Sequence, residues 1–132
     1  MRNRIELPDS MYPIQSFFNS LRERDFLDAL DSFAQGCGFS IEGASCSFPV
    51  NLSEDLGGRE DQYGYIEFWT YSGNQEVRVS FLDFMTFLGT AADNEIAYDP
   101  KMQSRIEEKM LAISEKVKGM EDRYRKAHGV IT

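Results

Sequence analysis

The chain has 132 residues, 42% of them hydrophobic and 13% aromatic, which excludes a disordered tail and fits one domain, residues 1–132, around a single core. Its net charge is -8, and the absence of any apolar run of about 18 residues excludes a membrane-spanning helix. Residues 25–100 hold fourteen acidic and two basic side chains, whereas residues 101–132 carry a net charge of +3. A negative middle disfavours direct nucleic-acid binding and favours a basic protein partner.

Neither catalysis nor metal binding is predicted. The amino terminus, MRNRIELPDS, lacks the apolar segment of a secretory signal, so we expect a cytoplasmic protein whose Cys37 and Cys46 stay reduced. Two cysteines without further thiolate or histidine partners do not make a zinc site. The only histidine, His128, lies in the tail RKAHGVIT, and no GxGxxG or GxxxxGK pattern is present. We therefore predict no catalytic residue, no cofactor and no enzymatic activity.

The first third of the chain predicts two helices and then extended structure. Apolar residues at helical spacing indicate a short helix over residues 13–21 and a longer one over residues 24–35, which Gly36 ends. Alternation over residues 39–48, broken at Gly43, predicts one bent strand or a bulged pair. Residues 51–62, NLSEDLGGREDQ, are predicted to be a polar loop, either a flexible surface loop or a binding loop.

The clearest pattern is a hairpin over residues 63–81, YGYIEFWTYSGNQEVRVSF, with two alternating runs around a glycine–asparagine turn. A two-residue turn pairs Phe68 with Val79 and Trp69 with Arg78, whereas a three-residue turn would mix the apolar and polar faces. One face is then apolar. The other carries Tyr65, Glu67, Trp69, Tyr71, Glu76 and Arg78. This second face is either covered by another element or serves in recognition, because protein interfaces favour aromatic residues and arginine.

Two helices are predicted after the hairpin. Ser80 and Asp83 resemble a capping arrangement, and Asp99 with Pro100 resembles the start of a long terminal helix. Along that helix the apolar residues recur at steps of three and four: Met102, Ile106, Met110, Ile113, Val117, Met120 and Tyr124. The order of elements predicts an α+β fold with N-terminal helices, a central antiparallel sheet with the hairpin at 63–81, and two C-terminal helices.

The segment from Phe18 to Pro49, FNSLRERDFLDALDSFAQGCGFSIEGASCSFP, resembles immunity proteins of bacterial contact-dependent growth inhibition (CDI) systems, in the branch that pairs with ribonuclease toxins. The strings GF and GASCSFP carry most of the resemblance, and EVRVSFLDFMTFL agrees with it. The resemblance extends over residues 17–98. It implies a small cytoplasmic protein that binds a toxin domain and covers its active site without chemistry of its own. The SEDLGGRED stretch and the terminal helix are the parts that resemble the family least.

A partner surface is predicted from the charge pattern and the hairpin together. We expect the partner to be the C-terminal domain of a toxin, basic because it holds RNA. The predicted contacts are Glu54, Asp55, Glu60, Asp61, Glu67, Trp69 and Tyr71. In this interpretation the aromatic side chains are anchors and the carboxylates face toxin cations. Two other classes remain: an acidic nucleic-acid mimic, which predicts a continuous carboxylate array, and a small-molecule-binding domain, which predicts a deep pocket.

Overall fold

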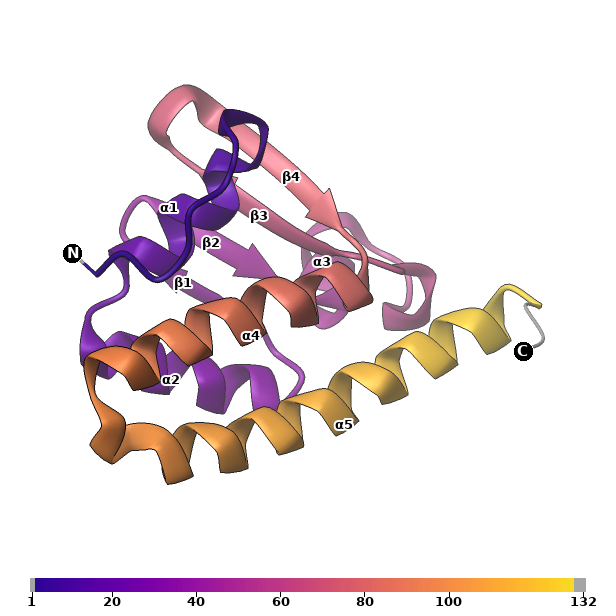
Figure 1. Ribbon diagram of the computed structural model, residues 1–132. Helices are drawn as coiled ribbons and strands as arrows, with labels where there is room; N and C mark the ends of the chain where they lie inside the picture. Colours follow the sequence, from indigo (N-terminus) through magenta and orange to yellow (C-terminus); the bar gives the residue numbers. More distant parts are fainter. Residues whose placement is uncertain (1, 130–132) are drawn as a thin grey trace.

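The computed structural model describes residues 2–129 as a four-stranded antiparallel sheet with helices packed on it (Figure 1). The strands, in the spatial order β1-β2-β3-β4, are β1 Phe39–Ile41, β2 Ala44–Ser47, β3 Ile66–Thr70 and β4 Gln75–Val79. The helices are α1 Tyr12–Ser20, α2 Glu23–Ala34, α3 Pro49–Leu56, α4 Phe81–Tyr98 and α5 Gln103–Ala127. Short 3-10 turns lie at η1 Asp9–Met11, η2 Glu60–Gln62, η3 Ser72–Asn74 and η4 Pro100–Met102. The predicted α+β fold is confirmed.

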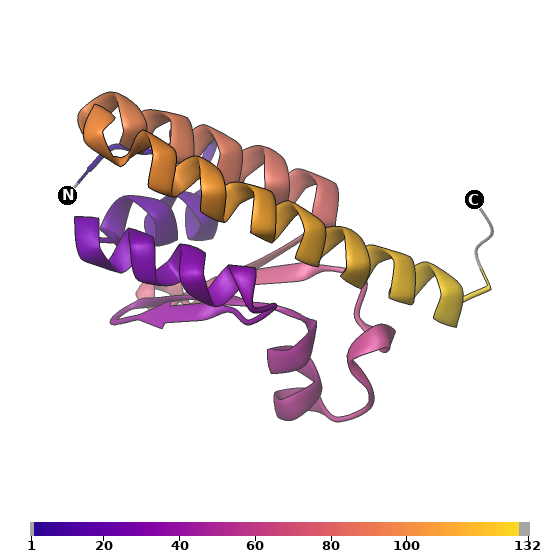
Figure 2. The same cartoon turned by 90° about the horizontal axis from the view of Figure 1, so that it is seen from below.

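Four helices, α1, α2, α4 and α5, lie on one side of the sheet, whereas α3 and the segment after it project from the other side (Figure 2). The core between the sheet and the four helices is rich in phenylalanine. The Phe33 and Phe48 rings stack with centroids 5.1 Å apart, and the Phe84 ring meets both edge-on. Phe68 of β3 completes this cluster, with its ring 6.2 Å from that of Phe84. One face of the sheet thus packs against the helices, with Cys46, Ile66 and Phe68 fully in the core and Phe39, Ile41 and Val77 partly buried at its edges.

The predicted register of β3 and β4 is wrong by two residues. Phe68 pairs with Val77, and the connection between the strands has four residues rather than two. A hydrogen bond of 3.0 Å from the Asn74 N–H to the Tyr71 carbonyl closes this turn, with Gly73 at φ 76° and Asn74 at φ 47°. Because side chains alternate with a period of two, a shift of two residues leaves the apolar and polar faces as predicted.

Residues 39–47 form a tight hairpin of two regular strands, neither one bent strand nor a bulged pair as predicted. Ile41 pairs with Ala44, so the turn between β1 and β2 is the two-residue Glu42-Gly43, with Gly43 at φ 91°. Glycine adopts this positive φ without a steric cost because it has no side chain, and the chain can therefore reverse here. Both strands are short, which made two strands hard to distinguish from one interrupted strand.

Half of the predicted polar loop is helical. Pro49 begins α3, and the Asn51 side chain accepts hydrogen bonds from the N–H groups of Phe48 and Gly38, at 2.9 and 2.8 Å. Proline suits the first turn of a helix because its missing N–H would be unpaired there. The helix ends at Leu56, and the two glycines that follow lead to η2. The carboxylates of this region are therefore held on two short helical pieces.

Gly38 is required by close packing, which gives a stability prediction. A Cβ atom at this position would lie 2.0 Å from the Cys46 carbonyl oxygen and 2.8 Å from Asn51 Oδ1. We expect Gly38→Ala to lower the free energy of unfolding by about 1–3 kcal/mol, as overpacking does. Gly89→Ala in α4 is the control, because a Cβ there meets no atom within 4 Å; it should raise the free energy by about 0.5–1 kcal/mol. Equal urea midpoints for the two variants would contradict this packing.

A buried ion pair attaches the amino-terminal segment to the helices. The Arg4 side chain is 0% exposed, and its Nε donates to Oε1 of Glu95 in α4 at 2.8 Å. Its Nη1 donates to the carbonyl oxygens of Phe18 and Leu21, at 2.7 and 2.6 Å. Arg2 binds the second Glu95 oxygen at 2.9 Å. The amino-terminal segment is therefore held in place by ion pairs, which its sequence does not indicate.

The two C-terminal helices agree with the predicted signals. The Ser80 hydroxyl accepts a hydrogen bond from the Asp83 N–H at 3.0 Å, and Asp99 caps the turn that leads into α5. The α5 residues that lie fully in the core are Ile106, Ile113, Val117 and Met120. Helix α4 continues to Tyr98, the residue directly before Asp99. Across residues 2–129, no helix is both long and apolar enough to cross a membrane.

Candidate functional site

The second face of the sheet is open in the part of the chain that the structure describes. The four packed helices lie on the opposite side (Figure 2). Register and alternation place on the open face Ser40 of β1, Ser45 and Ser47 of β2, Glu67 and Trp69 of β3, and Glu76 and Arg78 of β4. Of the two interpretations of the hairpin's polar face, covered or available for recognition, the open geometry favours recognition.

An aromatic pair stands at the hairpin end of this face. The rings of Trp69 and Tyr71 meet edge-on with centroids 4.3 Å apart, and the Tyr71 residue is 70% exposed. The indole Nε1 donates to Asn74 Oδ1 at 3.1 Å, which ties the tryptophan to the turn. Since the hydrogen bond and ring contact already fix its orientation, Trp69 would lose little side-chain entropy on meeting a partner.

Arg78 does not lie opposite Trp69, which corrects the predicted pairing of these two residues. With the observed register Trp69 lies opposite Glu76, and Arg78 lies opposite Glu67. The Arg78 Nε binds Glu67 Oε2 at 3.1 Å, and the guanidinium lies 4.7 Å from the centre of the Tyr65 ring. The hydrogen bond that Arg78 donates to Glu67 raises the pKa of the Arg78 guanidinium. The Glu67 carboxylate is therefore already paired within the chain.

Glu54 and Asp55 border the open face from the last turn of α3. Both are exposed, and neither has an ion-pair partner among the described residues. They line a polar hollow of about 200 Å³ together with Ser40 and Ser47 of the neighbouring strands. These two carboxylates thus present uncompensated negative charge beside the serine side of the sheet.

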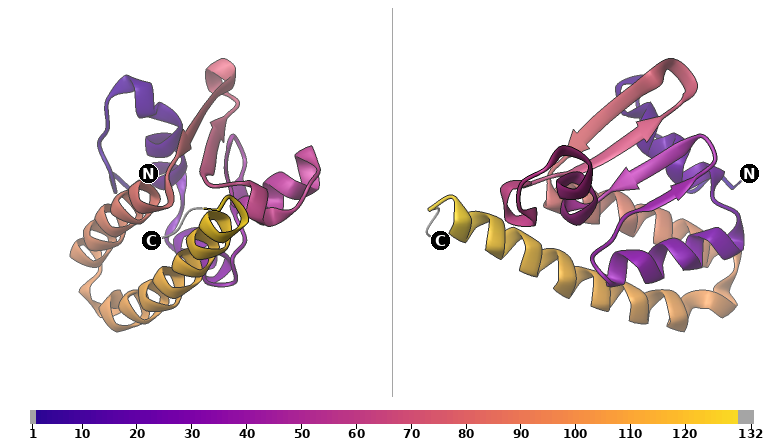
Figure 3. Two further views of the ribbon diagram at one scale, coloured as in Figure 1. Left: turned by 90° about the vertical axis from the view of Figure 1, so that its right-hand side faces the viewer. Right: turned by 180° about the vertical axis from the view of Figure 1, so that it is seen from behind.

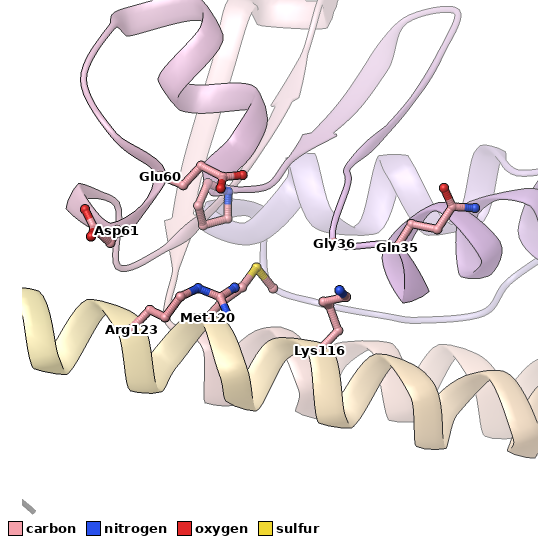
Figure 4. Close-up of a pocket in the computed structure, with 8 residues that line it drawn as sticks. Gln35, Gly36, Glu60, Asp61, Lys116, Met120 and Arg123 are labelled. Atoms are coloured by element: carbon pink, nitrogen blue, oxygen red, sulfur yellow. The ribbon is translucent and has the colours of Figure 1, made fainter.

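Glu60 and Asp61 lie apart from this face. They belong to η2 and line a different hollow, of about 160 Å³, whose other wall is Lys116 and Arg123 of α5 (Figure 4). Asp61 also pairs with Arg59 at 3.3 Å. Because cations of the chain itself face these two carboxylates, their negative field is partly offset before any partner arrives.

Residues 10–110 match the sequence profile of a family described as CDI immunity protein. The chain belongs to this family. The match covers α1 to α4, all four strands and the acidic residues that line the two hollows. It ends inside α5. Immunity proteins of this family neutralise CDI toxins, so a cognate CDI toxin is the partner of this chain. No curated protein matches the chain.

Residues that carry the family resemblance have structural positions in this CDI immunity protein. Gly38 packs against β2, and Gly43 forms the β1–β2 turn. Phe48 is fully buried in the aromatic core, and Pro49 starts α3. These positions set the fold around the open face rather than present side chains on it.

Five of the seven predicted contacts share one surface of the immunity protein, which we call the acidic–aromatic face: Glu54, Asp55, Glu67, Trp69 and Tyr71. The link between its two elements is the pairing of Glu67 with Ser47, since β2 runs directly into α3. The serines on this face were not predicted as part of it. The sequence indicates them through the alternation of Ala44, Ser45, Cys46 and Ser47, in which the small apolar residues face the core and the hydroxyl side chains face outward.

The cysteines and the histidine occupy unrelated places in the immunity protein. Cys46 is 2% exposed, and burial raises the pKa of its thiol well above the usual value. Cys37 is half-buried after α2. His128 is exposed after α5, with Nδ1 2.9 Å from the Tyr124 carbonyl oxygen. Among residues 2–129, no group of three or more His, Cys, Asp or Glu side chains could hold a metal ion.

Proposed function

We propose that this CDI immunity protein binds the catalytic domain of its cognate toxin through the acidic–aromatic face and covers an active site that cleaves RNA. The observation that carries the proposal is the combination of the Trp69–Tyr71 pair, at the hairpin end of the uncovered sheet face, with the unpaired carboxylates Glu54 and Asp55 of α3, which border that face. Aromatic anchors supply most of the energy of protein interfaces. Free carboxylates supply complementarity to a basic surface.

A ribonuclease suits this surface because it must hold a polyanion and therefore lines its groove with lysine and arginine. In the toxin groove, the carboxylates at the end of α3 would occupy the positions of RNA phosphates. The aromatic pair would occupy the positions of RNA bases. The net charge of -8 would also attract a basic domain at long range and raise the association rate.

Competition with RNA tests this function directly. The toxin domain should degrade a short RNA, and one equivalent of the immunity protein should stop the cleavage. A non-cleavable RNA analogue should compete with the immunity protein for a catalytically inactive toxin domain. A toxin domain that leaves RNA intact would refute the ribonuclease assignment. A ternary complex of toxin, analogue and immunity protein would refute active-site covering.

Reversing the free carboxylates should slow association. We expect the double variant Glu54→Lys, Asp55→Lys to lose about tenfold or more in association rate at low salt and to show a weaker salt dependence, because steering depends on charge. Stopped-flow fluorescence with the inactive toxin domain at low and high salt measures both. The matched control is Glu115→Lys, Asp122→Lys on exposed positions of α5, which changes net charge equally. Identical rates for the two double variants would place the contact elsewhere.

A further inference from the structure

A second candidate surface lies on the helical side of the molecule, where α4 and α5 run side by side (Figure 3). Their outward surfaces enclose an open hollow of about 550 Å³, which we call the α4–α5 groove. Met85 and Ile96 of α4 and Met110 and Leu111 of α5 give it apolar walls. Leu111 is 72% exposed. Met85, Ile96 and Met110 are partly buried. A groove of partly exposed methionine beside an exposed leucine is typical of surfaces that bind other proteins.

Gly89 forms part of the groove and has no role in the packing of the chain. It lies near the middle of α4, where glycine costs roughly 0.5–1 kcal/mol of helix stability relative to alanine. A Cβ atom at this position would meet nothing within 4 Å. The missing side chain therefore widens the groove rather than relieving an internal contact. A glycine in such a position allows the backbone of a partner to approach closely.

The charges of the groove select the type of occupant. Asp93 on α4 and Glu107 on α5 line it, and no basic side chain does. A second copy of this chain docked by the same groove would bring four like charges together, which disfavours self-association. A partner with lysine or arginine beside an apolar stripe would complement both the walls and the charges.

We propose that the α4–α5 groove binds an amphipathic α-helix of another protein, apolar along one stripe and flanked by lysine or arginine. From Met85 to Ile96 the groove follows α4 for about 17 Å, which matches roughly three turns of a docked helix. This site is distinct from the acidic–aromatic face, since the two lie on opposite sides of the sheet (Figure 2). An immunity protein with two such surfaces can hold its toxin and a second protein together.

Two synthetic peptides of about 15 residues test the proposal. Both carry the same leucine stripe, one with lysine flanks and the other with glutamate flanks, and binding is followed in the amide spectrum of the ¹⁵N-labelled protein. The lysine peptide should shift the resonances of Gly89, Met110 and Leu111, whereas the glutamate peptide should bind at least about tenfold more weakly. No binding, equal binding of both peptides, or shifts centred on other elements would overturn the proposal.

Two variants and one physical measurement complete the test. Gly89→Leu fills the groove, and Asp93→Lys with Glu107→Lys reverses its charges; each should weaken the lysine peptide about tenfold or more. The circular dichroism spectrum and toxin binding of each variant should stay unchanged, because neither alters the core or the acidic–aromatic face. Unchanged peptide binding by folded variants would overturn the proposal. So would a concentration-dependent dimer, seen by sedimentation and abolished by Leu111→Glu, since the groove would then hold a second copy.

Discussion

Arg4→Ala is expected to lower the free energy of unfolding by about 3–5 kcal/mol, because it breaks a buried ion pair by removing one partner. The substitution leaves the Glu95 carboxylate, 2% exposed, without its buried partner. It also removes the donor to the carbonyl oxygens of Phe18 and Leu21, which lie at the end of α1. Burial lowers the pKa of Arg4, and the hydrogen bond with Glu95 opposes that change. The pair is thus stable only as a unit.

Urea denaturation followed by circular dichroism measures this effect. Arg125→Ala is the control, because its ion pair with Glu121 is long, at 3.7 Å, and exposed, and should be worth less than about 0.5 kcal/mol. The double variant Arg4→Met, Glu95→Met should lose less than Arg4→Ala, since it leaves no unpaired buried charge. A loss for Arg4→Ala as small as that of the control would show that the amino-terminal segment is not held by this pair.

Trp69→Ala is expected to weaken binding of the toxin domain by about 2 kcal/mol or more, which is roughly 30-fold in Kd. Trp69 lies at the hairpin end of the open sheet face, between Ser45 of β2 and Glu76 of β4. Its ring packs on Tyr71 and its Nε1 donates to Asn74, so it would meet the toxin already oriented. Truncation removes the indole ring and its contact with Tyr71 from the face.

The control for Trp69→Ala is Tyr12→Ala, which removes a partly exposed aromatic ring from the start of α1. Titration calorimetry with the inactive toxin domain should show wild-type affinity for this control. Thermal unfolding of both variants separates loss of binding from loss of folding. If the folded Trp69→Ala protein bound the toxin domain with wild-type affinity, the aromatic pair would not be part of the interface.

Helices and sheet faces of this fold were predictable because each follows from local periodicity. The seam of Ile106, Ile113 and Val117 and the cap at Ser80 are examples. The β3–β4 register was not predictable, because two- and four-residue connections keep the same faces and only the closure of the turn separates them. Helix α3 was not predictable, because Pro49 directly follows the alternating residues 39–48 and suits the end of a strand as well as the first turn of a helix.

The grouping of the acidic residues could not be predicted either. Glu54 and Glu60 are six positions apart, yet the first borders the open sheet face and the second faces Lys116 of α5. That division depends on where α5 packs, which local sequence does not encode. The ion pair of Arg4 and Glu95 joins residues 91 positions apart for the same reason. Side chains that act across elements need the tertiary structure.

Amide hydrogen exchange of the immunity protein, alone and with its catalytically inactive toxin domain, tests the central claim most directly. Binding through the acidic–aromatic face should slow exchange in β2, in β3, in the turn at residues 71–74 and in the last turn of α3. Exchange in α4 and α5 should stay as in the free protein, because these helices lie on the other side of the sheet. Protection confined to α4 and α5, with β2 and β3 unchanged, would contradict the assignment of the toxin-binding surface.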